Sequence, residues 1–216
     1  MFAVFFAVVL GIVLLAHVWN YERPVNAYTF ARPNGLSGLN AGVLREKTPV
    51  AVEVGSLGSG LGTGSELQVD FTPGLAELGD ARPWWWLPGL WGAASGSLTG
   101  DGDCIGLSWV TAERQWIGCP LTSTSPLSIW LVHSKYRRYL SDVEGMNPWT
   151  LTDSDVPLLS RVQFVEVVVR PGWALGIPAH WGWAARAQQP STTPWWRVDQ
   201  HSAVSLVADG LWNEGS

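Results

Sequence analysis

The sequence is poor in charge. Lys, Arg, Asp and Glu make up 14 % of its 216 residues, against roughly 25 % in an average soluble domain. The net charge is −5, and the densest basic cluster is Lys135, Arg137 and Arg138 in SKYRRYL. Because nucleic-acid binding needs a basic face, we expect no nucleic-acid partner and interpret this cluster as a solvated turn.

Cysteine is also scarce. Cys104 and Cys119 are too few for a disulfide framework. They can pair only if their strands lie side by side, and we expect them to stay reduced. No C-x-x-C or H-x-x-x-H spacing offers a zinc site, and neither G-x-S-x-G nor a P-loop is present.

Long helical periodicity is missing after residue 20, whereas tryptophan, glycine and proline are abundant. The sequence holds 15 Trp, 24 Gly and 14 Pro, a composition that favours β-strands with frequent turns. One short helix is expected in KYRRYLSDVEGM, residues 135–146. Short apolar segments that we expect to be antiparallel strands of a barrel or sandwich cover 48–55, 104–110, 114–121, 126–134, 159–172, 174–181 and 202–210.

The first 19 residues are apolar except for His17. At about 1.5 Å per residue, a helix of this length just spans a hydrocarbon core of about 30 Å. A cleaved signal peptide would have basic residues before the core and a small-x-small site after it, and a buried core helix is seldom apolar on every face. We therefore predict a single-pass transmembrane anchor over 1–20, with residues 1–19 in contact with lipid.

The residues that flank the anchor set its expected orientation. No Lys or Arg precedes it, whereas Arg23 and Arg32 follow it closely. Positive charge favours the cytoplasmic side, so we expect the rest of the chain to face the cytoplasm.

A glycine-rich segment follows the first predicted strand of the β domain. GSLGSGLGTG, residues 55–64, follows a predicted strand but is not followed by the helix that dinucleotide binding requires, so we interpret it as a hairpin loop.

ARPWWWLPGLW, residues 81–91, contains two prolines and cannot be a regular central strand. We expect it to be either a hydrophobic plug or an exposed contact surface. Its tryptophans are Trp84, Trp85, Trp86 and Trp91.

The stretch PGWALGIPAHWGWAAR, residues 171–186, places His180 among Trp173, Trp181 and Trp183. With the valine-rich run before it, this stretch resembles the C-terminal half of the cupin and JmjC-like double-stranded β-helix family. The match is made by Pro171-Gly172 and by Pro178-x-x-Trp181. It implies a mainly β, cupin-like (jelly-roll) antiparallel barrel, with a connector over 21–47 and the β domain over 48–216.

Oxygenases of this family hold iron with a His-x-Asp/Glu pair and a distant histidine. The chain has four histidines, His17, His133, His180 and His201, and none begins a His-x-Asp or His-x-Glu. The resemblance puts Trp183 at the distal-histidine position, and an indole cannot ligate a metal. We therefore expect no catalytic residue, no metal and no cofactor.

These features favour a membrane-anchored, non-enzymatic structural or interaction protein with protein partners in a large assembly, such as a virion or capsid. The candidate barrel-mouth or interface residues are Trp84, Trp85, Trp86, Trp91, Trp173, His180, Trp181 and Trp183. Two alternatives stay open. One is a divergent Fe(II)/2-oxoglutarate oxygenase, and the other is a cupin that binds a small ligand in its barrel.

Overall fold

The computed structural model describes residues 2–22, 30–33, 39, 41–54, 86–100 and 102–206. Its helices are α1 (Phe2–Glu22), α2 (Ala41–Arg45) and α4 (Arg137–Leu140), with 3-10 turns η2 (Ser134–Tyr136), η3 (Ser141–Val143) and η4 (Leu159–Arg161). Its strands are β1 (Val50–Glu53), β2 (Trp86–Leu98), β3 (Cys104–Trp109), β4 (Arg114–Gly118), β5 (Leu127–Val132), β6 (Phe164–Val169), β7 (Trp173–Pro178), β8 (Gly182–Ala187) and β9 (Thr193–Ser202).

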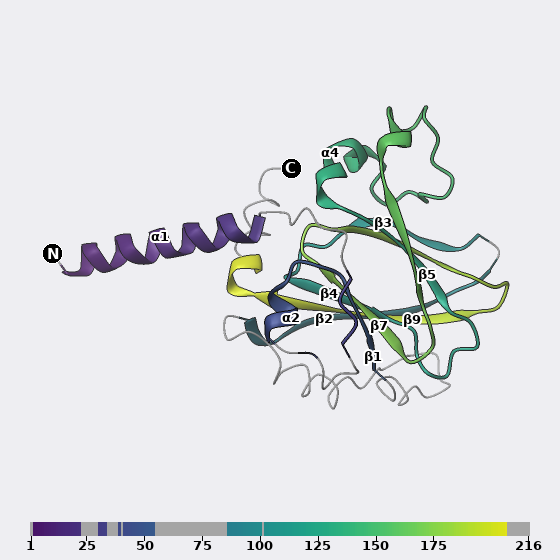
Figure 1. Cartoon of the computed structure of the whole chain (residues 1–216), viewed down its shortest axis with the longest axis horizontal. Helices are drawn as coiled ribbons and strands as arrows, with labels where there is room; N and C mark the ends of the chain where they lie inside the picture. The colour runs from purple at the N-terminus through teal and green to yellow at the C-terminus, as the bar shows by residue number, and fades with distance from the viewer. Residues whose placement is uncertain are drawn as a thin grey trace.

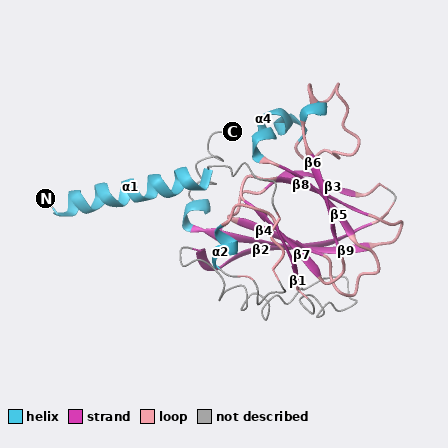
Figure 2. Cartoon of the chain, in the orientation of Figure 1, coloured by secondary structure: helices cyan, strands magenta, loops and turns pink. Residues whose placement is uncertain are grey.

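The described strands form two antiparallel sheets that lie face to face (Figure 2). One has the order β1-β7-β4-β9-β2, and the other has the order β3-β8-β5-β6. From β2 to β9 the chain alternates between the sheets except at the β5-β6 pair, which is the strand order of a double-sheet jelly roll. The prediction of a mainly β, jelly-roll fold is confirmed by this strand order.

The space between the sheets is filled by alternate residues of the central strands. Leu127, Ile129 and Leu131 point inward from β5, and Leu175 and Ile177 point inward from β7. Successive side chains of a strand face opposite sides, so each strand gives every second residue to this interior cluster.

The outer face of the five-stranded sheet is covered by the segment that precedes β1. Leu39 and Leu44 are buried against Trp116, Trp196 and Val198. This segment is part of the predicted connector over 21–47. Its described part contains α2 and packs into a second hydrophobic cluster, because its leucines cover apolar side chains that the sheet would otherwise expose to water.

The outer face of the four-stranded sheet is covered by residues 134–163, which include the predicted short helix as η2, α4 and η3. The cover is tied to β3, since Leu107 N donates to Met146 O at 2.9 Å and Gly145 N donates to Leu107 O at 2.7 Å. A Cβ on Gly106 would lie 2.0 Å from Gly145 O. Only glycine allows this close approach.

The C-terminal strand was predicted in the wrong place. β9 covers Thr193–Ser202, while 203–206, part of the predicted 202–210 strand, is helical. Ser202 ends the strand because its hydroxyl accepts from Ser205 N at 3.1 Å and its own N–H donates to Ser205 Oγ at 2.9 Å. This reciprocal pair is a helix N-cap, which an apolar pattern does not reveal.

Strand β2 lies at the edge of its sheet and contains Pro88. Its register against β9 shifts between Trp86 and Trp91. A proline cannot donate to a ladder and is tolerated at an edge or a bulge. Residues 86–91 of this segment therefore belong to an irregular edge strand, as Pro88 requires.

Helix α1 projects away from the two sheets (Figure 1). Its described apolar side chains are exposed, among them Phe5, Ile12 and Leu15. Within the described part of the chain, no helix has the length and hydropathy of a membrane crossing, so the transmembrane anchor over 1–20 stays a prediction.

Candidate functional site

The turn between β7 and β8 contains His180 and Trp181, two of the four candidate residues with a described side chain. His180 adopts a left-handed conformation with φ of 67°, and its N–H donates to Val110 O at 2.9 Å. Val110 N in turn donates to Trp181 O at 2.9 Å. These bonds hold the turn against the end of β3. They fix His180 in an unusual backbone conformation next to a buried tryptophan.

Trp181 and Trp183 lie in the interior cluster, 2 % and 1 % exposed. Trp181 contacts the buried ring of His133 edge-on, with ring centroids 5.0 Å apart. His133 Nδ1 accepts from Lys135 N at 3.1 Å and so begins the η2 turn. Neither tryptophan is accessible to a partner from outside, since both fill space between the sheets.

No metal site emerges from the described residues, which contain no group of three or more His, Cys, Asp and Glu side chains close enough to hold an ion. Trp183 sits between Leu131 on β5 and Ser108 on β3. Cys104 and Cys119 are not bonded to each other, and Cys119 is buried.

The interior also contains one polar group of side chains. Gln115 Nε2 donates to Asp199 Oδ1 at 2.5 Å across β4 and β9, and Arg197 Nη2 lies 3.4 Å from Asp199 Oδ2. Gln115 is 7 % exposed, yet its Oε1 finds no partner among the described residues, and neither does Trp183 Nε1. A buried polar atom without a partner is costly. Sequence analysis missed this group because only the pairing of β4 with β9 brings Gln115 and Asp199 together.

A second buried polar group lies where β4 begins. Burial raises the pKa of Glu113 above its ordinary value. The hydroxyl of Ser202 and the charge of Lys47 lower this pKa and offset only part of the rise. Burial lowers the pKa of Lys47, and the charge of Glu113 offsets only part of this decrease. Ser202 Oγ donates to Glu113 Oε2 at 2.9 Å, but the same oxygen caps the 203–206 helix. We interpret Ser202 as a structural residue, since a capping oxygen is poorly placed to act as a nucleophile.

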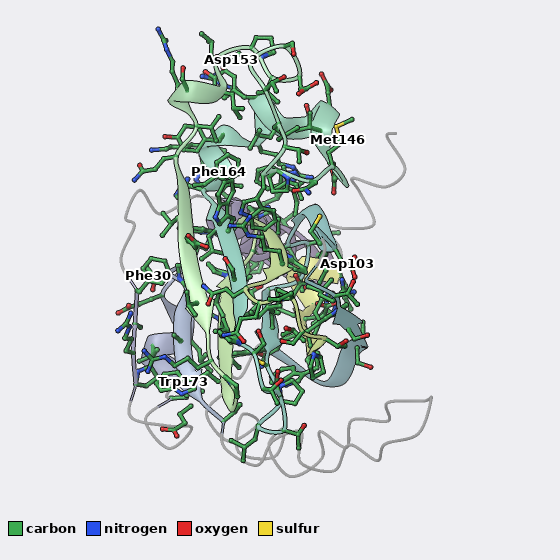
Figure 3. The ribbon with its side chains drawn as sticks, turned by 90° about the vertical axis from the view of Figure 1, so that its right-hand side faces the viewer. Phe30, Asp103, Met146, Asp153, Phe164 and Trp173 are labelled. Carbon is green, nitrogen blue, oxygen red and sulfur yellow. The ribbon has the colours of Figure 1, made fainter. Side chains whose placement is uncertain are left out.

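A groove with a volume of about 500 Å³ reaches the surface among the described residues. It runs between β6, an edge strand of the four-stranded sheet, and β1, an edge strand of the five-stranded sheet. Trp173, one of the candidate residues, lines it together with Phe30. Figure 3 shows these two side chains toward one edge of the sandwich and Asp103 toward the opposite edge.

The tryptophans of the 81–91 segment stay unassigned. Trp84 and Trp85 lie outside the described residues. Trp86 and Trp91 are placed in β2 by their pairing with Ser202 and Gln200, but their side chains are outside the described part. The choice between a plug and a contact surface therefore stays a prediction.

Comparison with known proteins gives little. No protein-family model matches the chain, and no curated protein matches it. Among solved structures, the chain is similar to the vicilin from Solanum melongena, whose structure is described as having different anionic ligands in structurally similar pockets. The identity is 10 %, the TM-score is 0.34, and the match covers 52 % of this chain and 24 % of the vicilin. The chain thus spans about a quarter of that protein, and the fold assignment rests on the strand order of this chain.

Proposed function

We propose that this protein is a membrane-anchored, non-enzymatic interaction protein. Helix α1 holds it in a bilayer, and the jelly-roll domain contacts protein partners. By the positive-inside bias of Arg23 and Arg32, the domain faces the cytoplasm. A virion or capsid membrane is one assembly in which such a domain would serve.

The exposed surface of α1 is the observation that carries the proposal. Exposed apolar side chains follow one another along the helix, including Phe5 at 69 %, Ile12 at 61 % and Leu15 at 71 % exposure. Between Phe2 and His17 the helix contains no charged residue on any face. A surface of this kind is stabilised by leaving water for an apolar phase, and lipid surrounds a helix on all sides.

The packing of the domain supports a structural role over a catalytic one. Aliphatic side chains, Trp181 and Trp183 occupy most of the space between the sheets, where the oxygenases that the sequence resembles hold iron. By that resemblance, Trp183 has an indole where the oxygenases have a metal-ligating histidine. A packed interior leaves the outer surface and the edges of the sheets for contacts with partners.

Purification of the full chain in mild detergent tests this role. We expect stoichiometric partner proteins in cross-linking mass spectrometry and no stoichiometric iron in metal analysis. Turnover of 2-oxoglutarate by the purified protein, lost on His180→Ala, would replace the proposal with the oxygenase alternative. Protease treatment of sealed vesicles tests the orientation, because a cytoplasmic domain is digested in inverted vesicles and shielded in right-side-out vesicles.

A second candidate function, the binding of a small polar ligand, is favoured by the unsatisfied Gln115 Oε1 inside the barrel. Native mass spectrometry of the purified chain tests it. A bound small molecule that is lost in Gln115→Leu but kept in the surface variant Arg138→Gln would establish this function.

A further inference from the structure

The groove along β6 follows the edge of a strand and does not lie over one face of it. Four consecutive residues, 165–168, line one wall, so side chains from both faces of β6 border it. Phe30, Arg32 and Ala51 form the facing wall. Arg170 and Trp173 lie at the end where the chain leaves β6 for β7.

The pairing of the neighbouring strand shows which main-chain groups face the groove. Gln188 N donates to Pro126 O, so this pair is hydrogen-bonded between β8 and β5. In an antiparallel ladder, hydrogen-bonded pairs of residues alternate with pairs that are not hydrogen-bonded to each other. Every second residue of β5 therefore directs its main-chain N–H and C=O groups to the same neighbouring strand. Ser128 and Trp130 therefore direct their main-chain groups to β8, and Ile129 directs its groups to Val167 of β6.

It follows that Glu166 and Val168 direct their N–H and C=O groups away from β5 and toward the groove. Within the described part of the chain, no strand pairs with this side of β6. The sequence FVEVVV has strong β-propensity, and Val168 is 46 % exposed. An unblocked edge of this kind is a template for another strand.

Most of the described lining of the groove is apolar. Phe30, Ala51, Val167 and Trp173 are partly buried and pack against the interior cluster. The six residues of β6 extend over about 20 Å at roughly 3.3 Å per residue. The groove thus offers apolar contacts beside a row of open main-chain groups.

The rim of the groove is basic. Arg32 and Arg170 are exposed and line it, and neither forms an ion pair within the described residues. Among the described lining residues, Glu166 alone is acidic, and its carboxylate accepts a hydrogen bond from the Ser128 hydroxyl. Charge complementarity therefore favours an acidic occupant.

We propose that the β6 groove binds an extended acidic segment of a partner protein by strand addition. The segment pairs with the main-chain groups of Glu166 and Val168, and its carboxylates contact Arg32 and Arg170. Its apolar side chains lie on Phe30 and Trp173. This inference rests on the proposed interaction role and names the chemistry of the partner.

The probe is an end-blocked, fluorescein-labelled peptide of sequence Thr-Val-Glu-Val-Glu-Val-Thr. Its binding to the full chain in detergent micelles is measured by fluorescence anisotropy. The comparison peptide has lysine in place of both glutamates. We expect the acidic peptide to bind at least tenfold more tightly than the basic one, and we expect this preference to shrink as salt is added.

Two variants separate the main-chain contribution from the charge contribution. Val168→Pro removes one N–H that faces the groove without breaking the ladder to β5, and we expect it to weaken binding by about three- to tenfold. Its matched control, Val168→Thr, keeps the N–H and the β-branched shape and should bind like the wild type. The double variant Arg32→Gln, Arg170→Gln should weaken binding about tenfold, whereas Arg138→Gln on α4 should not. Thermal unfolding of each variant checks that the fold is retained.

Equal binding of the acidic and basic peptides, or unchanged binding by Val168→Pro, would overturn the proposal. So would sedimentation that shows a dimer of this chain that Val168→Pro dissociates, because the occupant would then be a second copy. A chain that stays in membranes with its partners but ignores the acidic peptide would refute only the groove assignment. Loss of membrane attachment would refute only the anchor.

Discussion

Replacing Arg114 with methionine should release the segment before β1 from the outer face of the sheet. The Arg114 side chain is 1 % exposed and donates hydrogen bonds to four carbonyl oxygens. The acceptors are Leu44 O at 3.3 Å, Glu46 O at 2.7 Å, Thr48 O at 3.1 Å and Gly176 O at 3.2 Å. Burial lowers the pKa of Arg114 to about 10, so it stays charged at neutral pH.

The magnitude follows from two opposing terms. Hydrogen bonds to a charged donor contribute about 1.5–3 kcal/mol each, which gives a gross loss of roughly 6–12 kcal/mol for four of them. Burying the charged guanidinium costs the wild type several kcal/mol, and the variant does not have this cost. We therefore expect Arg114→Met to lower the free energy of unfolding by about 3–5 kcal/mol, the range for breaking a buried charged network.

Urea unfolding followed by tryptophan fluorescence measures this change, with Arg138→Gln as the exposed control. Limited trypsin digestion reports the location, because cleavage after Arg45 and Lys47 should accelerate in Arg114→Met before the domain unfolds. An unfolding midpoint and a cleavage rate equal to those of the wild type would refute the role of Arg114 as the residue that holds this segment.

Three further predictions concern the interior and its titrating groups. Trp183→Ala should lower the free energy of unfolding by about 3–5 kcal/mol in urea titrations, whereas the exposed Tyr139→Ala should change it little; equal effects would contradict the packing described. One thiol, Cys104, should react with iodoacetamide in the native chain and two after unfolding, because Cys119 is buried; modification of Cys119 in the native state would argue against this. Burial raises the pKa of Glu113 above 4.5, so the folded state binds this proton more tightly, and the stability it contributes is present below pH 4.5 and lost as pH rises through the raised pKa. Glu113→Gln should therefore gain stability relative to the wild type as pH rises above 4.5, which urea titrations at several pH values measure. Stabilities of variant and wild type that change in parallel with pH would show that the carboxyl is not buried.

Much of the fold could be read from local sequence. β5 and β7 were predicted because apolar runs ended by turns are typical of short buried strands. β9 was not, because TPWWRVDQHS mixes tryptophans with charged residues and its outer side chains are buried only by the segment before β1. The helix at 203–206 depends on the Ser202 and Ser205 cap, which a window of apolar residues does not detect.

The candidate site was accessible to sequence analysis only in part. The Pro171-Gly172 turn and Trp173 lie beside the β6 groove, so the stretch 171–186 was informative. The other residues of the groove come from positions far apart in the chain, such as Phe30 and Val168. The Gln115 and Asp199 pair likewise arises from strand pairing, which a single sequence does not specify.

Alkaline carbonate extraction of membranes that contain the full chain tests the proposed anchor most directly. We expect the wild type to stay in the membrane pellet. The variant Val9→Lys, Leu14→Lys should move to the supernatant, because each charge within an apolar helix costs about 2.5–3.5 kcal/mol of insertion. The control Met146→Lys places a lysine at an exposed apolar position of the β domain and should stay in the pellet. Release of the wild-type protein by carbonate would contradict the anchor and the function built on it.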